Sequence, residues 1–121
     1  MTTSATSAGT ARYAKRFSAV AVPAHFREGQ KIYVSSLGIG TYLGQPDDKT
    51  DASYAASVMA AVENGLNVID TAINYRFQRS ERSIGSALKQ LAQKGFSRDE
   101  FILCTKGGYL TPDGSMPSDP N

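Results

Sequence analysis

The chain has 121 residues, of which 40% are hydrophobic and 20% charged, and its formal net charge is +2. This composition is typical of one soluble globular domain, and without a strongly basic stripe it argues against nucleic acid or an anionic membrane as partner. No apolar run reaches about 18 residues, so no transmembrane helix is predicted. The single cysteine, Cys104, excludes an internal disulfide and is typical of a reducing compartment, so we expect a cytoplasmic protein.

The N-terminal segment is rich in Ser, Thr and Ala, and no acidic residue occurs before Glu28. We expect residues 1–16 to form a flexible tail and residues 17–121 to form the folded part. A basic, hydroxyl-rich segment without acids is also typical of an organelle transit peptide, which is the alternative. Residues 16–26 are a candidate for a short hairpin.

The folded part opens with a strand and a helix. β-Formers and glycines predict a strand near Ser35–Ile39 that ends at Gly40. Apolar residues then recur with helical spacing over Ala52–Asn64, and Gly65 is well placed to end this helix in a left-handed conformation. The candidate N-caps are Thr50 and Asp51, and the apolar stripe consists of Ala55, Val58, Met59 and Val62.

A second strand and helix follow directly. Residues 66–70 predict a strand, residues 71–79 a loop, and Ser80 is a plausible N-cap, with Glu81 suited to the positive end of the helix dipole. The residues with helical spacing are Ile84, Ala87, Leu88 and Leu91, and Gly95 is the expected stop. Residues 100–106 predict a third strand, and residues 107–121 have turn and loop chemistry.

Strands that alternate with helices imply parallel βαβ units. Two architectures have this order: an open doubly wound sheet, and part of a (β/α)8 barrel. Both keep their functional residues at the C-terminal edge of the sheet.

Two opposite charges stand at strand ends in this pattern. Side chains alternate along a strand, so Asp70 shares a face with Val68, and Lys106 shares one with Cys104. If these faces coincide, Asp70 and Lys106 lie side by side, because neighbouring strands are about 4.8 Å apart. Tyr75 lies in the loop that leaves the same edge.

Together these three residues predict a general acid. A free tyrosine has a pKa of about 10, and a neighbouring ammonium group lowers it by favouring the phenolate. A carboxylate beside the lysine keeps the lysine charged and oriented, so Asp70 would hold Lys106 and Lys106 would tune Tyr75.

Each of these residues also has an ordinary interpretation. Asp70 is then a turn residue, Tyr75 a packing residue and Lys106 a solvated lysine. We expect Cys104 to be a small buried strand residue, not a nucleophile. His25, the single histidine, precedes the first parallel strand and is expected to be structural or exposed.

The combination of motifs over Lys31–Gly108 resembles the aldo-keto reductases. The motifs that carry the resemblance are SSLGIGTYLG, NVIDTAINY, SERSIGSAL and RDEFILCTKGG, in this order. The resemblance implies the first three βα units of a (β/α)8 TIM barrel. It further implies reduction of an aldehyde or ketone to an alcohol with NADPH, a small-molecule carbonyl as substrate, and no metal.

The resemblance also implies roles for particular residues. Tyr75 would donate a proton to the carbonyl oxygen, Lys106 would make it more acidic, and Asp70 would pair with Lys106. Gly40, Thr41, Tyr42 and Asp70 match positions expected near the nicotinamide of the cofactor.

Part of the family pattern is not matched. The family's catalytic histidine lies near the end of a fourth strand, and most of its phosphate and adenine contacts come from the last strands and loops. We therefore expect the 121 residues to be the N-terminal part of a longer barrel and to be inactive alone. The alternatives are a non-enzymatic nucleotide-sensing subunit of the channel β-subunit type, and a receiver-type signalling domain. A receiver domain needs acidic residues where this chain has Gly40 and Thr41.

Overall fold

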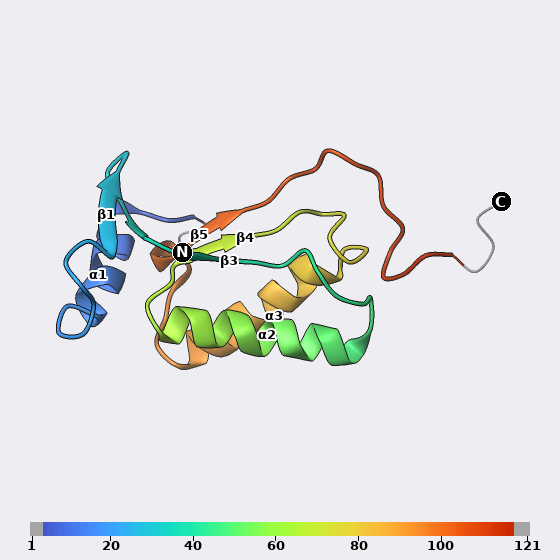
Figure 1. The fold of residues 1–121 in the computed structure, drawn as a ribbon, viewed down its shortest axis with the longest axis horizontal. Coiled ribbons are helices and arrows are strands. Elements are labelled where there is room, and N and C mark those ends of the chain that lie inside the picture. Colours follow the sequence, from blue (N-terminus) through green and yellow to red (C-terminus); the bar gives the residue numbers. More distant parts are fainter. Residues whose placement is uncertain (1–3, 118–121) are drawn as a thin grey trace.

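The computed structural model describes residues 4–117, and in this part of the chain two helices cover one face of a three-stranded parallel sheet (Figure 1). The strands lie in the order β3 (Gly38–Gly40), β4 (Val68–Asp70) and β5 (Ile102–Cys104). The helices are α2 (Asp48–Glu63) and α3 (Arg79–Gln93). The predicted alternation of parallel strands and helices is confirmed.

The core lies between the sheet and these two helices. On the sheet, Ile69 is fully buried, and Ile39 and Leu103, its partners in register, pack against the same cluster. The helices contribute the buried side chains Ala55, Val58, Val62, Ile84, Ala87 and Leu91. Most of the predicted apolar stripes are therefore buried, whereas Met59 and Leu88 lie at the margin of the core.

The ends of the helices differ in part from the prediction. Asp47, not Thr50 or Asp51, caps α2, because its carboxylate accepts a hydrogen bond from the Thr50 amide at 2.8 Å. Helix α3 begins at Arg79, so Ser80 lies inside its first turn and does not cap it. Both helices end as predicted, since Gly65 and Gly95 follow them with φ angles of +99° and +92°.

The expectation of a flexible tail over residues 1–16 is wrong for most of that segment. Residues 7–16 form helix α1 (Ser7–Arg16), capped by Thr6, whose side chain accepts the Gly9 amide hydrogen. Tyr13 is fully buried and its hydroxyl donates to the Val62 carbonyl at 2.6 Å. Composition misled here because the acids that pair with this basic segment come from a distant part of the chain. The first three residues lie outside the described part.

Burial changes the chemistry of the anchoring tyrosine in α1. Burial and then the nearby Glu100 carboxylate raise the pKa of the Tyr13 phenol, so it remains a neutral hydrogen-bond donor. Glu100 belongs to a short 3₁₀ turn, η1 (Arg98–Glu100), which precedes β5.

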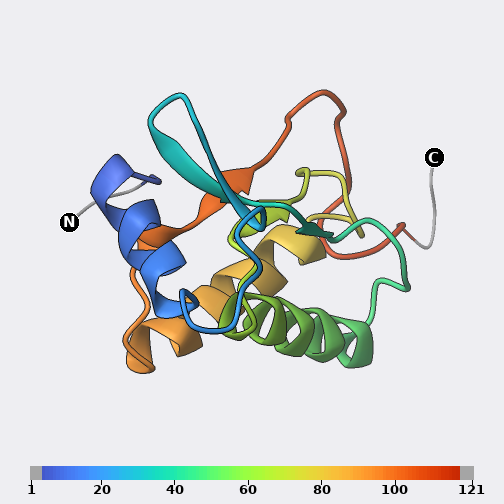
Figure 2. The ribbon, with the colours of Figure 1, turned by 60° about the vertical axis from the view of Figure 1, so that its left-hand side comes forward.

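The predicted hairpin exists, but further along the chain than residues 16–26. Strands β1 (Phe26–Gly29) and β2 (Ile32–Ser35) pair antiparallel across a turn in which Gln30 and Lys31 have positive φ angles. Ser35 therefore ends a hairpin strand, and the first parallel strand is the short β3. Figures 1 and 2 show α1 and the hairpin together at the end of the sheet where the parallel strands begin.

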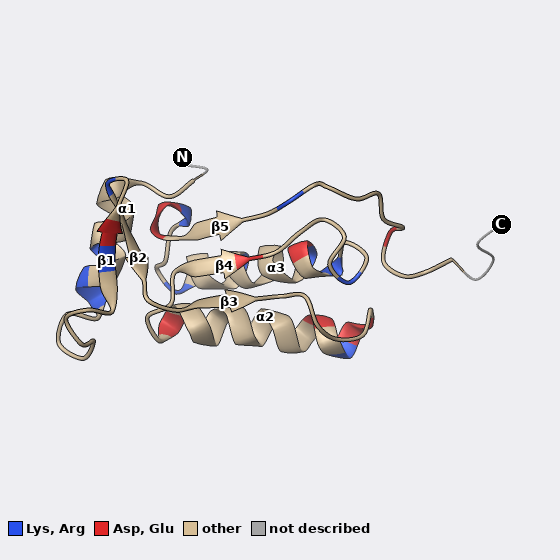
Figure 3. Ribbon diagram, turned by 45° about the horizontal axis from the view of Figure 1, so that its top comes forward, with Lys and Arg blue, Asp and Glu red and all other residues tan. Residues whose placement is uncertain are grey.

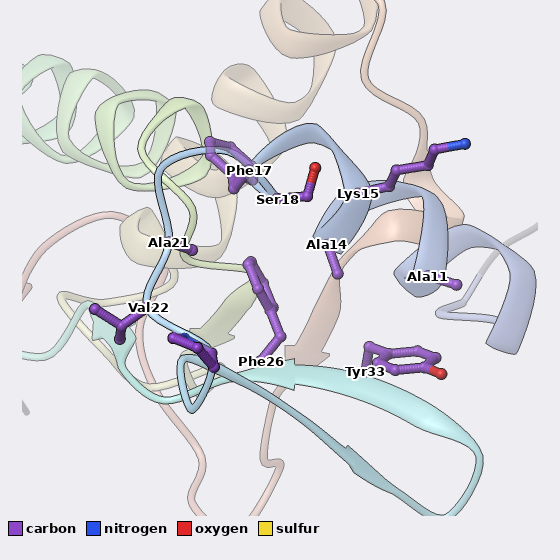
Figure 4. A pocket seen from close by; sticks show the side chains of 10 residues that line it. Ala11, Ala14, Lys15, Phe17, Ser18, Ala21, Val22, Phe26 and Tyr33 are labelled. Carbon is purple, nitrogen blue, oxygen red and sulfur yellow. The ribbon is translucent and has the colours of Figure 1, made fainter.

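A mostly apolar pocket lies between α1, the loop that follows it and the hairpin (Figure 4). Its larger side chains are Phe17, Phe26 and Tyr33. It is at the opposite end of the sheet from Asp70 and belongs to the packing of α1.

The second face of the sheet has no helix over it in residues 4–117 (Figure 1). Cys104 lies on this face and is exposed, so the expectation that it is buried is wrong. The segment that follows β5 has no helix or strand up to Pro117, as predicted, and residues 118–121 lie outside the described part. No described helix is both long and apolar enough to cross a membrane.

Candidate active site

Asp70 and Lys106 meet at the C-terminal edge of the sheet. The register places Asp70 opposite Cys104, so Lys106, two residues further on, returns to the same side. Lys106 Nζ lies 2.9 Å from Asp70 Oδ1, and about half of each side chain is exposed. Figure 3 shows this as an acidic tip on β4 beside a basic segment beyond β5. The predicted contact is confirmed.

Tyr75 lies beside this ion pair. Lys106 Nζ is 5.2 Å from the centroid of the Tyr75 ring, within the range of a cation–π contact. The backbone keeps the loop close, because the Ile73 amide donates to the Lys106 carbonyl at 2.9 Å. The three residues selected from the sequence are therefore neighbours in space.

The electrostatics favour a charged lysine. The hydrogen bond to Asp70 and, to a smaller extent, the negative charge of Asp70 raise the pKa of Lys106 above its ordinary value. The ammonium group is therefore protonated across the physiological pH range. It can stabilise a phenolate that forms when a nearby tyrosine releases its proton.

The predicted cofactor positions differ in their surroundings. Gly40 is opposite Asp70 in the register, and a Cβ built on it would meet nothing within 4 Å. Tyr42 is 65% exposed, and its ring packs edge-on against Tyr75 with centroids 5.0 Å apart. Gly40 and Tyr42 thus offer an open surface with an aromatic ring beside the candidate acid.

Thr41 has a different place in the structure. Its side chain is buried, and its hydroxyl donates to the Asp70 carbonyl at 3.0 Å. Its own carbonyl accepts the Ser80 hydroxyl at 2.6 Å. Thr41 therefore joins the end of β4 to the start of α3 through internal hydrogen bonds at the C-terminal edge of the sheet, which we call the rim, and its side chain is not free to contact a ligand.

Reasoning from the sequence missed the side chains that hold this rim together. Arg76 and Ser80 are both buried, and Ser80 and Glu81 tie the start of α3 to neighbouring segments through hydrogen bonds to Thr41 and Thr105. A charged or hydroxyl residue in a polar loop gives no signal of its burial in a single sequence.

His25 has a structural position, as expected. Its ring nitrogens lie 2.8 Å from the Ser36 hydroxyl and 2.8 Å from the Gly65 carbonyl. Its ring also packs edge-on against Phe26. It is part of the hairpin end of the molecule and not of the rim.

Comparison with known protein families identifies this arrangement. The model of the aldo/keto reductase family matches residues 36–120, which include all three parallel strands of the described structure and the Asp70, Tyr75 and Lys106 cluster. The chain belongs to the aldo/keto reductase family.

Three curated relatives illustrate the range of this similarity. The aldo-keto reductase YhdN of Bacillus subtilis is 36% identical over 81 residues, covering 62% of this chain and 22% of the relative. The 6-dehydroglucose reductase of Novosphingobium aromaticivorans is 36% identical over 87 residues, covering 67% and 28%. A putative voltage-gated potassium channel subunit beta of Schizosaccharomyces pombe is 30% identical over 86 residues, covering 70% and 24%.

A solved structure supports the same assignment. The aldo-keto reductase from Klebsiella pneumoniae, crystallised in complex with NADPH, matches with a TM-score of 0.53 and 28% sequence identity. The match covers 70% of this chain and 28% of that protein. The chain thus spans less than a third of the length of each of these relatives.

Proposed function

We propose that this chain carries part of the active site of an NADPH-dependent carbonyl reductase, which converts an aldehyde or ketone into an alcohol in the cytoplasm. The observation that carries the proposal is the contact of Asp70, Lys106 and Tyr75 at one sheet edge, with Lys106 2.9 Å from the carboxylate and over the phenol ring. Membership of the family supports the reaction class.

In this proposal Tyr75 is the proton donor. Its hydroxyl protonates the oxygen of the carbonyl group as the carbon is reduced, and Lys106 stabilises the phenolate that remains. Asp70 accepts the hydrogen bond that keeps Lys106 beside the ring. A proton from solvent then restores the phenol.

The residues at the rim fit a nicotinamide cofactor, which when bound would supply the hydride. Gly40 leaves the edge of β3 free of side-chain atoms, and the exposed ring of Tyr42 offers a flat apolar surface beside Tyr75. Gly40, Tyr42 and Asp70 would hold the nicotinamide end. The buried Thr41 would support this surface through its bonds to Asp70 and Ser80.

We further propose that turnover requires βα units beyond the three described here. The edges of β3 and β5 that face away from β4 pair with no strand of residues 4–117, and the face that carries Asp70 is open. In a (β/α)8 barrel, further strands would cover both edges and enclose this face.

A direct measurement tests this second proposal. The 121-residue chain alone is expected to melt without cooperativity in far-UV circular dichroism and to oxidise no NADPH in the presence of an aldehyde. A sharp melt from a monodisperse monomer, or turnover by this chain alone, would contradict it.

The decisive test of the proposed function uses the full polypeptide that carries this chain. Tyr75→Phe removes the proton donor and keeps the ring, so carbonyl reduction should fall by about 10²–10⁴-fold while the affinity for NADPH stays unchanged. Tyr109→Phe is the control, because Tyr109 is 76% exposed in the loop beyond Lys106. Undiminished turnover in Tyr75→Phe would remove Tyr75 from the mechanism.

The similarity to a channel subunit supports a second candidate. A relative named a putative voltage-gated potassium channel subunit beta is 30% identical over 86 residues. On this alternative, the same rim binds the nucleotide as a sensor and the protein has little reductase activity. Steady-state turnover with a panel of aldehydes separates the two, since a sensor binds NADPH tightly and consumes it slowly.

A further inference from the structure

Arg76, the residue that follows Tyr75, is a buried arginine at the rim. Its side chain is 1% exposed and its guanidinium lies 5.0 Å from the centroid of the Tyr54 ring. Nε donates to the Gln45 carbonyl at 3.0 Å, and Nη2 donates to the Asp47 carbonyl at 3.4 Å and to the Asp51 carboxylate. One side chain therefore connects the Tyr75 loop to the β3–α2 loop and to the first turn of α2.

The backbone at this point is strained. Arg76, Phe77 and Gln78 all have left-handed conformations, with φ angles of 50°, 55° and 72°. For residues with a Cβ such conformations are uncommon and cost free energy, so surrounding contacts must hold them in place. Arg76 supplies such contacts at the first of these positions, directly after Tyr75.

The β3–α2 loop, to which Arg76 donates hydrogen bonds, also carries Tyr42, the aromatic partner of Tyr75. Tyr42 precedes Gln45 in the β3–α2 loop, and its ring packs against Tyr75 at 5.0 Å. One guanidinium group therefore fixes the loop that carries Tyr75 relative to the loop that carries Tyr42. Burial makes this link rigid, because a desolvated arginine keeps its partners more firmly than a solvated one.

We propose that Arg76, held by Asp51, is a positioning residue for Tyr75: it sets the place of the phenol relative to Lys106 and Tyr42. This inference rests on the proposed function, in which Tyr75 is the proton donor. It assigns the placement of Tyr75 to an ion pair between the buried Arg76 and the partly exposed Asp51, outside the Asp70, Tyr75 and Lys106 cluster.

The substitution Arg76→Gly tests the proposal without adding backbone strain, because glycine adopts positive φ angles freely. In the full polypeptide, kcat for carbonyl reduction should fall by about 10–100-fold, as expected for a displaced catalytic group, while the dissociation constant for NADPH stays within about twofold. Asp51→Asn should lower kcat in the same direction. Added ethylguanidinium should restore part of the kcat of Arg76→Gly and none of that of Tyr75→Phe.

A matched control is available in the following helix. Arg82 is 56% exposed and pairs with Asp113 at the surface, so Arg82→Ala removes an arginine close to the same turn without removing the buried link. Its kcat should equal that of the wild type. If Arg76→Gly also keeps the wild-type kcat, or if kcat falls only in proportion to the folded fraction, Arg76 does not position Tyr75.

A second measurement does not depend on activity. In the full polypeptide with labelled tyrosines, a ring-to-ring nuclear Overhauser effect between Tyr42 and Tyr75 is expected in the wild type and in Arg82→Ala, and should disappear in Arg76→Gly. Persistence of this signal in Arg76→Gly overturns the inference even if turnover falls. If the wild type reduces no carbonyl but the signal is present in it and lost in Arg76→Gly, the proposed function is rejected and the positioning role stands.

Discussion

The two ends of the sheet differ in how far their paired carboxylates are exposed to solvent. At the end where the strands begin, Glu100 is fully buried and accepts hydrogen bonds from Arg12 and Arg16, each at 2.9 Å. At the end where they finish, Asp70 and Lys106 pair at the same distance but remain about half exposed.

The difference follows from what each pair connects. The Glu100 cluster joins α1 to η1, which are distant in sequence, and the Glu100 side chain within it is fully buried. The Asp70 pair lies on an open edge with nothing above it in residues 4–117. A buried carboxylate shared by two guanidinium groups holds elements together, whereas an exposed pair beside a phenol remains free to act on a ligand.

The largest expected effect concerns activity at the rim. Lys106→Met removes the ammonium that stabilises the Tyr75 phenolate, so carbonyl reduction by the full polypeptide should fall by about 10²–10⁴-fold. Stability should not change measurably, because the pair is solvent-exposed. Steady-state kinetics check the loss of turnover, and urea unfolding of the same preparation checks that the stability is unchanged. A loss of stability comparable to the loss of activity would remove the contrast between the two ends.

The second prediction concerns the opposite end. Glu100→Ala removes the acceptor that Arg12 and Arg16 share, so the free energy of unfolding should fall by about 1.5–3 kcal/mol, the size of a hydrogen bond to a charged group. Turnover per folded molecule should stay the same. Urea denaturation of the full polypeptide measures the change, with Glu63→Ala as control, since Glu63 pairs with Lys94 at the surface. If Glu100→Ala and Glu63→Ala lowered the free energy of unfolding equally, burial of Glu100 would add nothing to the stability.

A third prediction tests how closely α1 packs on η1. A Cβ added to Gly9 would lie 2.3 Å from the Asp99 carbonyl oxygen, so Gly9→Ala should destabilise the protein by about 1–3 kcal/mol through overpacking. Gly85→Ala in α3 is the matched control, because a Cβ there meets nothing within 4 Å. It should stabilise by up to about 1 kcal/mol through helix propensity. The same sign for both variants would contradict the close packing of α1.

The smallest effect is expected at the start of α1. Thr6 caps the helix through its bond to the Gly9 amide at 2.8 Å, so Thr6→Ala should cost about 1 kcal/mol. Hydrogen exchange of the α1 amides should quicken accordingly, whereas Thr6→Ser, which retains the hydroxyl, should exchange like the wild type. Unchanged protection in Thr6→Ala would mean that the cap contributes nothing to α1.

The local pattern of the sequence predicted much of the fold and the three residues of the candidate acid. The periodicity of apolar residues indicated α2 and α3, and glycines marked their ends, because backbone preferences and side-chain spacing act over a few neighbouring residues. The alternation of side chains along β4 and β5 predicted that Asp70 and Lys106 meet if the two faces coincide, and the register confirms that they do.

Contacts between distant segments were decided by the tertiary structure alone. Helix α1 depends on Glu100 from a remote turn, and the burial of Arg76 depends on acceptors from the β3–α2 loop and α2. The exposure of Cys104 depends on which face of the sheet the helices cover. A single sequence gives no account of these features, because the free energy of a buried charge or an uncovered face is set by partners that only folding brings together.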